Sequence, residues 1–134
     1  MPNVIVDTGP LVSLFKRRDR DHVRVLGYLK NHPCTLMTTW PVVTEAWHLL
    51  APSAALGLVR WIAAGGLVVC ELGEGAAVEM ARLLVKYRDR PMDLADASLV
   101  LLAQRTGLLD ILTIDRADFA TYRLADRRRF NQVL

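Results

Sequence analysis

The apolar residues of this chain alternate between short continuous runs and longer stretches in which they recur every three or four positions. The first run, Val4-Ile5-Val6, is β-branched throughout and predicts a short buried strand. The longer stretches have the spacing of helices that bury one face. We therefore expect strands at 3–6, 34–38, 67–72 and 110–114, helices at 10–15, 22–31, 42–50, 54–64, 73–88 and 92–103, and a short helix after 115.

The order of these elements predicts the fold class. Strands that alternate with helices form a parallel sheet with helices on both of its faces. We expect an α/β fold with a central parallel sheet of four to five strands flanked by helices, in a single domain over residues 1–134. The side chains of Val23, Trp40, Trp47 and Tyr87 are expected to point into the core.

Length and composition exclude several classes of protein. The chain has 134 residues, 52% of them apolar, and a mean hydropathy of +0.23, which predicts a folded chain rather than a disordered one. No stretch of about eighteen uncharged apolar residues occurs, so we expect no membrane span. The sequence starts without a basic and apolar leader, and two cysteines do not make a disulfide framework. We expect a cytoplasmic protein in which Cys34 and Cys70 are buried.

The charged residues give a weak indication of the partner. The net charge is +3, and fourteen of the seventeen cationic residues are arginine. The planar guanidinium group suits phosphate, so this composition is compatible with a nucleic-acid partner. A biased genome composition also enriches arginine, and the count alone does not separate the two explanations.

Four carboxylates stand in apolar surroundings. Asp7 and Asp115 each follow an apolar strand, and open α/β sheets place their ligands at the carboxyl ends of such strands. Glu45 and Asp96 lie on helices whose other residues on the same face are apolar. An unpaired carboxylate in such surroundings costs roughly several kcal/mol unless it is protonated. Convergence of the four groups on one divalent cation removes this cost.

Simpler roles stay open for some of the acids. Asp7 has the position of a turn or cap residue before a helix. Asp93 and Asp96, and likewise Asp115 and Asp118, have the spacing of an N-cap and an acid in the first helical turn. For Asp93 and Asp118 a role at a helix start is sufficient, although Asp93 is also a candidate metal ligand.

The type of the side chains predicts which metal would bind. An oxygen-only ligand set favours Mg²⁺ or Mn²⁺, because these hard cations prefer carboxylates and water. The histidines at 22, 32 and 48 are scattered and pair with no cysteine at the spacing of a zinc site. The expected metal ligands are Asp7 and Asp96, with Glu45, Asp115 and Asp93 as further candidates.

A carboxylate-held cation serves phosphoryl chemistry, because it can activate a water and neutralise charge on phosphate oxygens. Several arginines lie next to the acidic positions in the sequence and are candidates for contacting a phosphate backbone. Solvent exposure without any ligand is the alternative for each of them. These arginines are Arg88, Arg90 and Arg116, with the run 127–129 as an extension.

The motifs that carry the acids resemble those of PIN-domain ribonucleases. They are Val6-Asp7-Thr8-Gly9-Pro10-Leu11, Thr44-Glu45-Ala46, Leu94-Ala95-Asp96-Ala97 and the segment 112–119, and they span almost the whole chain in this order. Within this family, the size of the chain is similar to that of the VapC-type toxins of bacterial toxin–antitoxin pairs.

The resemblance implies a Mg²⁺- or Mn²⁺-dependent endoribonuclease with Asp7, Glu45, Asp96 and Asp115 as its catalytic acids. It further implies a homodimer and a cognate antitoxin protein that blocks the active-site groove. Thr8 and Thr113 match hydroxyl positions of the family. They join Arg88, Arg90 and Arg116 as candidates for binding the RNA substrate.

Three functions other than a toxin nuclease are compatible with part of this pattern. A phosphotransfer or receiver-type domain also gathers acids at strand ends, but it needs a lysine after a late strand, and none of the three lysines lies there. A non-catalytic RNA- or partner-binding module on the same fold is expected to lack at least one of the four acids, and none is missing. A PIN nuclease that processes RNA without a toxin role is the third.

Overall fold

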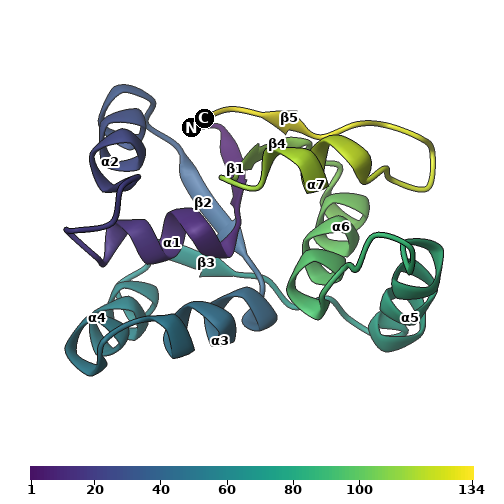
Figure 1. Ribbon diagram of the computed structural model, residues 1–134, viewed down its shortest axis with the longest axis horizontal. Coiled ribbons are helices and arrows are strands. Elements are labelled where there is room, and N and C mark those ends of the chain that lie inside the picture. The colour runs from purple at the N-terminus through teal and green to yellow at the C-terminus, as the bar shows by residue number, and fades with distance from the viewer.

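The computed structural model describes residues 1–134 around a central sheet of five strands. All neighbouring strands are parallel, and their order is β3-β2-β1-β4-β5 (Figure 1). The four strands expected from the sequence are present, and the end of the chain adds the fifth. The strands are β1 (Asn3–Val6), β2 (Thr35–Thr38), β3 (Leu67–Val69), β4 (Asp110–Leu112) and β5 (Asn131–Gln132).

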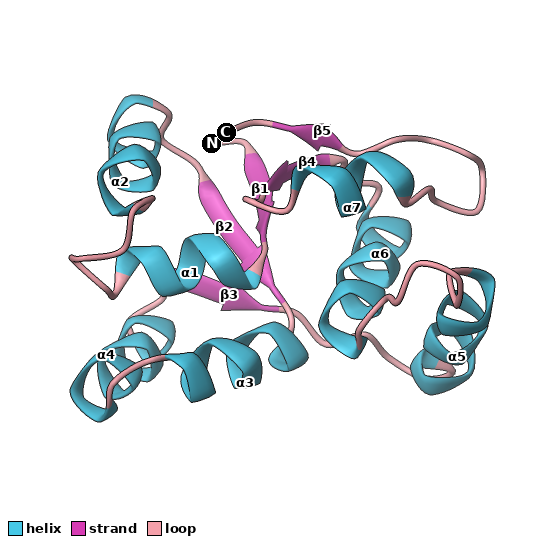
Figure 2. Ribbon diagram, viewed as in Figure 1, coloured by secondary structure: helices cyan, strands magenta, loops and turns pink.

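Seven helices surround the sheet. In the view of Figure 2, α1 to α4 gather on the side of β2 and β3, and α5 to α7 on the side of β4 and β5. None of them has both the length and the apolar character needed to cross a membrane. The helices are α1 (Thr8–Leu14), α2 (His22–Asn31), α3 (Trp40–Leu49), α4 (Pro52–Ala63), α5 (Ala76–Lys86), α6 (Leu94–Thr106) and α7 (Arg116–Thr121).

Strand β1 occupies the centre of the sheet and is the most enclosed of the strands. Val4, Ile5 and Val6 are buried, as the β-branched run predicts for a strand covered on both faces. The backbone N–H of Asp7 still donates to the carbonyl of Leu112 at 3.0 Å, just after β1 ends. The chain therefore leaves β1 and β4 at the same edge of the sheet, which brings the residues after both strands together.

Helix α6 forms much of the core beside the sheet. Eight of its residues are buried, and only its first turn reaches the carboxyl edge with a polar side chain. The hydroxyl of Ser98 on this helix lies 2.6 Å from that of Thr39, the residue that precedes α3, and both residues are buried. This hydroxyl pair fixes the start of α3 against α6. It thereby holds the helix that carries Glu45 in place relative to the helix that carries Asp96.

The inward face of α2 differs from the expected one. Val23 is 79% exposed, and Val25 is the buried residue instead. Tyr28 and Leu29, three and four positions after Val25, pack against the core with it. The start of the inward face is thus Val25 rather than Val23.

Two tryptophans expected in the core also lie at the surface. Trp40 is 49% exposed and Trp47 43% exposed, because α3 buries the face that carries Val42, Val43 and Ala46. Tyr87 is half-buried and packs against the core, as expected. Cys34 and Cys70 are free and half-buried rather than fully buried.

Glycines in the left-handed conformation lie at the boundaries of two helices. Helix α5 begins at Ala76 rather than at 73, because Gly73 and Gly75 have φ values of 78° and 75°. These left-handed conformations are incompatible with a continuous helix. Gly107, with φ of 76°, closes helix α6 directly after Thr106.

The enclosed position of β1 predicts that its side chains carry much of the stability. Truncation of fully buried Ile5 in Ile5→Ala should lower the free energy of unfolding by about 2–5 kcal/mol. Val23→Ala, at an exposed position, should change it by no more than about 0.5 kcal/mol. Urea unfolding followed by circular dichroism measures both values, and equal losses in the two variants would contradict the assigned burial.

Candidate active site

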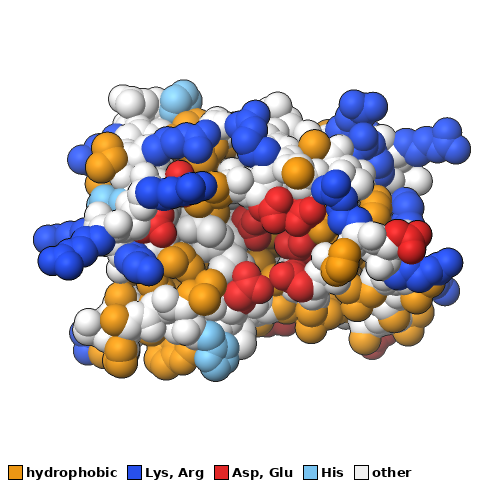
Figure 3. Space-filling model, in the orientation of Figure 1, with side chains coloured by type: hydrophobic (Ala, Val, Ile, Leu, Met, Phe, Trp, Pro, Cys, Tyr) orange, Lys and Arg blue, Asp and Glu red, His pale blue; other side chains and the backbone are white.

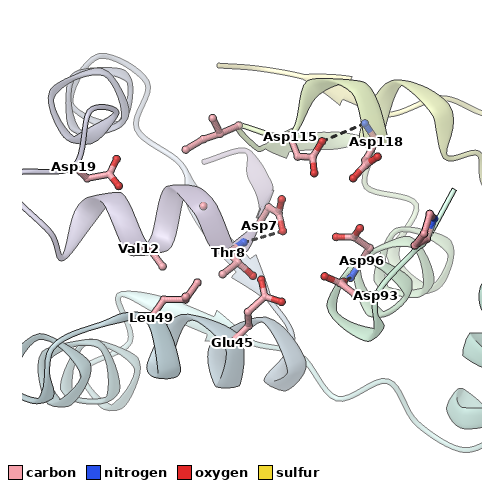
Figure 4. Close-up of a pocket in the computed structure, with 13 residues that line it drawn as sticks. Asp7, Thr8, Val12, Asp19, Glu45, Leu49, Asp93, Asp96, Asp115 and Asp118 are labelled. Carbon is pink, nitrogen blue, oxygen red and sulfur yellow. Dashed lines mark hydrogen bonds between the residues drawn. The ribbon is translucent and has the colours of Figure 1, made fainter.

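An open cavity lies at the carboxyl edge of the sheet and is strongly acidic. Its volume is about 590 Å³, and seven of its thirteen lining residues are Asp or Glu, with no Lys, Arg or His among them. Figure 3 shows these acids in a hollow near the centre of one face, with Lys and Arg side chains around it. The seven acids are Asp7, Asp19, Glu45, Asp93, Asp96, Asp115 and Asp118 (Figure 4).

The four acids predicted to act together reach this cavity from four separate elements. Asp7 follows β1 and caps α1, and Glu45 comes from the first half of α3. Asp96 lies in the first turn of α6, and Asp115 caps α7. In Figure 4 their side chains point from both sides into the same space. The structure thus brings together residues that are up to 108 positions apart in the sequence.

The carboxylate of Asp7 is buried, with only 7% of the residue exposed. It accepts hydrogen bonds from the backbone N–H of Thr8 and from the hydroxyl of Thr113, each at 2.8 Å. Burial, with a smaller effect of the charges of Glu45 and Asp93, outweighs the lowering effect of these two bonds, and the pKa of Asp7 is raised to about 6. The cap role considered for Asp7 is therefore real, but it leaves a desolvated carboxylate without a basic side chain paired to it.

Thr113 joins two of the acidic segments. Its hydroxyl donates to Asp7 and accepts a hydrogen bond from the backbone N–H of Asp115 at 3.0 Å. The residue is 2% exposed and does not line the cavity, and both hydrogen bonds of its hydroxyl are to the acidic segments. Thr113 therefore fixes the ends of β1 and β4 relative to each other.

Asp96 has a second neutral donor. The hydroxyl of Tyr122 donates to its Oδ2 at 2.8 Å. The pKa of Asp96 is raised to about 7, because burial and the charges of Asp93, Asp7 and Asp118 outweigh the lowering effect of the Tyr122 bond. Sequence reasoning missed Tyr122, because nothing in its local pattern shows that a residue 26 positions away will approach Asp96.

No Lys or Arg forms an ion pair with Asp7, Glu45 or Asp96. The pKa of Asp115 is also raised, first by burial and second by its hydrogen bond with the side chain of Asp118. The one basic side chain paired with a cavity acid is that of Arg90, whose Nη1 lies 3.1 Å from Oδ1 of Asp118. No basic side chain therefore neutralises the three acids at the centre of the cavity.

The helix starts account for two of the remaining acids. Asp93 caps α6, and its Oδ1 accepts from the backbone N–H of Asp96 at 2.8 Å. Asp118 occupies the first turn of α7, where its N–H donates to Oδ1 of Asp115 at 3.3 Å. These are the helix-start roles expected from the spacing. Asp19, from the charged segment after α1, also lines the cavity and was not predicted, because a charge run normally indicates solvent exposure.

The arginines proposed to bind substrate lie at different places. Arg90 is at the cavity through Asp118, whereas Arg88 donates to the carbonyl of Val85 at 3.4 Å and is exposed. Arg116 donates to the carbonyl of Leu134 at 3.2 Å. Neither Arg88 nor Arg116 lines the cavity, and in the run 127–129 Arg128 pairs with Asp126.

Comparison with known proteins agrees with this geometry. Residues 4–124 match the PIN domain family. The chain belongs to the PIN-domain family. A curated relative, ribonuclease VapC26 of Mycobacterium tuberculosis, is 31% identical over 134 residues, which cover 97% of this chain and 99% of the relative.

Two solved structures have the same fold as this PIN domain. The crystal structure of Mycobacterium tuberculosis VapC20, a Sarcin-Ricin loop cleaving toxin, superposes with a TM-score of 0.78 at 19% identity, over 85% of this chain and 91% of that one. A toxin–antitoxin complex from Klebsiella pneumoniae gives a TM-score of 0.62 at 20% identity, over 88% and 91% of the two chains. At these identities the likeness concerns the fold alone.

The cavity of this PIN domain has the donors that a hard cation requires. No three of its acidic side chains lie close enough to hold a metal ion together as they stand. A Mg²⁺ ion, however, keeps several of its waters and binds proteins through one or two carboxylates, so three direct ligands are not needed. The hydroxyl of Thr8, which lines the cavity beside Asp7, is buried and has no hydrogen-bond partner. An unsatisfied polar atom at this place fits a site that receives a hydrated cation or a phosphate oxygen.

The raised pKa values of Asp7 and Asp96 predict how stability depends on pH without metal. Between their ordinary value near 3.8 and about 6 to 7, the folded protein holds protons that the unfolded chain has released. Their contribution to stability is therefore present at low pH and is lost as the pH rises through the folded pKa values. Thermal melts in EDTA should give a higher Tm at about pH 5 than at about pH 8. In the double variant Asp7→Asn, Asp96→Asn this difference should shrink, and an unchanged difference would contradict the assigned pKa shifts.

Proposed function

We propose that this PIN-domain chain is a Mg²⁺- or Mn²⁺-dependent endoribonuclease and the toxin of a type II toxin–antitoxin pair. The observation that carries the proposal is the meeting of Asp7, Glu45, Asp96 and Asp115 in one cavity that contains no basic side chain. The similarity to a VapC ribonuclease along nearly the whole chain supports the nuclease activity and the toxin role.

Asp7 and Asp96 are the residues that would hold the cation. Both are desolvated and held in place by hydroxyl groups, and neither has a basic partner. A bound divalent cation supplies a more acidic water and neutralises charge on the phosphate oxygens. Glu45 and Asp115 lie on either side of this pair, where they can orient the attacking water and accept its proton.

The charge distribution suits a polyanionic substrate. Half of the fourteen acids line the cavity, so the rest of the chain carries seventeen Lys and Arg against seven Asp and Glu. This outer surface would attract RNA phosphates. At the acidic centre a bound cation would offset the repulsion between the carboxylates and the phosphates. In this arrangement Arg90 contacts a phosphate at the edge of the cavity, with Thr8, Arg88 and Arg116 as further candidates and Thr113 acting through Asp7.

Two partners belong to the proposal. An antitoxin protein would block the acidic groove until it is removed, and two copies of the chain would form a homodimer. The Klebsiella pneumoniae neighbour is a toxin–antitoxin complex and supports the first of these. Co-expression with the product of an adjacent reading frame, followed by size-exclusion chromatography with light scattering, tests both.

The activity prediction concerns Asp96. Wild type should cleave single-stranded or looped RNA when Mg²⁺ or Mn²⁺ is added and should stop in EDTA. Asp96→Asn should lower the rate by about 10²-fold or more, because the amide keeps the volume but brings no charge to the cation. Asp89→Asn, an exposed acid outside the cavity, is the matched control and should cleave at the wild-type rate. Cleavage that survives EDTA, or equal rates in the two variants, would contradict the proposal.

Arg90 provides a prediction about substrate binding. Arg90→Ala should raise KM for RNA and reduce the slope of log affinity against log salt by about one, because one phosphate contact is lost. The exposed Arg60 on α4 is the matched control, and Arg60→Ala should change neither. A fall in kcat at saturating RNA with KM unchanged would show that Arg90 acts through Asp118 and not on the phosphate backbone.

A further inference from the structure

Helix α7 contributes to the acidic cavity at both of its ends. Asp115 caps its start and lines the cavity, while Tyr122 follows its last residue and reaches Asp96 on α6. The hydroxyl of Tyr122 is the one side-chain donor to Asp96, and it leaves Oδ1 of that carboxylate without a hydrogen bond. Asp96 thus lines the cavity with one carboxylate oxygen fixed by the protein and the other free of hydrogen bonds.

The ring of Tyr122 is held firmly. The residue is 0% exposed, and its ring meets those of Tyr87 and Phe119 edge-on, at centroid distances of 5.1 and 5.2 Å. Phe119 contacts Phe130 in the same way at 5.4 Å. These aromatic contacts restrict the ring, so the direction of the hydroxyl is set before any ligand binds.

The backbone around Tyr122 is fixed as well. Its N–H donates to the carbonyl of Asp118 at 3.0 Å. The guanidinium of Arg123 donates to the carbonyls of Ala120, Thr121 and Tyr122, which satisfies the end of α7. A hydroxyl on such a support cannot follow Asp96 if that side chain moves, and Asp96 must instead adopt the position that the hydroxyl allows.

The donor to Asp96 is a neutral hydroxyl, which affects the charge of the site differently from a basic side chain. An arginine at this place would orient Asp96 but would also cancel its charge and compete with a cation. The phenol donates one hydrogen bond and brings no charge of its own, so it orients Asp96 without competing with a cation. Thr113 holds Asp7 in the same way, through a hydroxyl at 2.8 Å.

We propose that Tyr122 is a positioning residue of the nuclease site, which fixes the Asp96 carboxylate through Oδ2 so that Oδ1 is presented to the cation. This inference rests on the proposed function, because it assigns Asp96 to cation binding. It adds a residue outside the four acids and makes α7 and the C-terminal segment part of the support of the site.

The test compares Tyr122→Phe with Tyr87→Phe, both of which remove one hydroxyl from the same aromatic cluster. The hydroxyl of Tyr87 accepts from the backbone N–H of Arg123 at 2.9 Å and does not touch Asp96. Binding of Mn²⁺ in the absence of RNA is measured by electron paramagnetic resonance, together with Tm and RNA cleavage. In Tyr122→Phe the Kd for Mn²⁺ should rise about tenfold or more, and kcat should fall with KM for RNA unchanged. Added Mn²⁺ should recover part of the rate. Tyr87→Phe should keep the wild-type Kd whatever its Tm.

The outcomes separate this inference from the proposed function. If wild type binds Mn²⁺ and Tyr122→Phe binds it equally well while folded, Tyr122 has no positioning role and the nuclease proposal stands. If both tyrosine variants lose affinity to the same extent, the packing of the rings and not the hydroxyl supports the site, and the inference is wrong. If wild type itself binds no Mn²⁺, both proposals fail.

Discussion

Asp7 is a carboxylate at the end of the most enclosed strand of the sheet, where it has little contact with water and no basic partner. Asp7 lies there because it directly follows β1. The apolar side chains of β1 are buried, and the strand lies between β2 and β4, so the residue at its end is also inside the protein. Charge in this place is unfavourable, and burial raises the pKa of Asp7 accordingly. The backbone N–H of Thr8 and the hydroxyl of Thr113 lower this cost without removing it. The protein therefore keeps an unfavourable charge at the carboxyl edge, which a cation would relieve.

Other acids of the cavity are also held by neutral donors rather than by basic side chains. Helix starts supply backbone N–H groups to Asp93 and Asp115, and a hydroxyl donates to Asp96, but no Lys or Arg reaches the three central acids Asp7, Glu45 and Asp96. The basic residues lie on the surrounding surface instead. In the proposed function, a negative centre in a positive surface would attract a cation to the centre and a phosphate chain to the surface, and would so link the fold to phosphodiester hydrolysis.

The sequence was sufficient for those parts of the site that depend on local pattern. Asp7 and Asp115 could be found because each follows an apolar strand, and Glu45 and Asp96 because each lies on an apolar helical face. The contact between Tyr122 and Asp96 and the place of Asp19 could not be found in this way, since both result from how distant elements pack. The surface positions of Val23 and Trp40 were missed for a related reason: apolar spacing shows that a helix has an inner face, but not which of two adjacent stripes the neighbouring elements cover.

The central claim is that Asp7 and Asp96 are held as a destabilised pair that receives a divalent cation. It is tested most directly by calorimetric titration of the wild-type protein with Mn²⁺ in buffers of different ionisation enthalpy. At about pH 6.5 the two carboxyls are partly protonated, so binding should release protons to the buffer, and at about pH 8.5 the release should nearly vanish. Binding with the same proton release at both pH values, or no binding at either, would contradict the account.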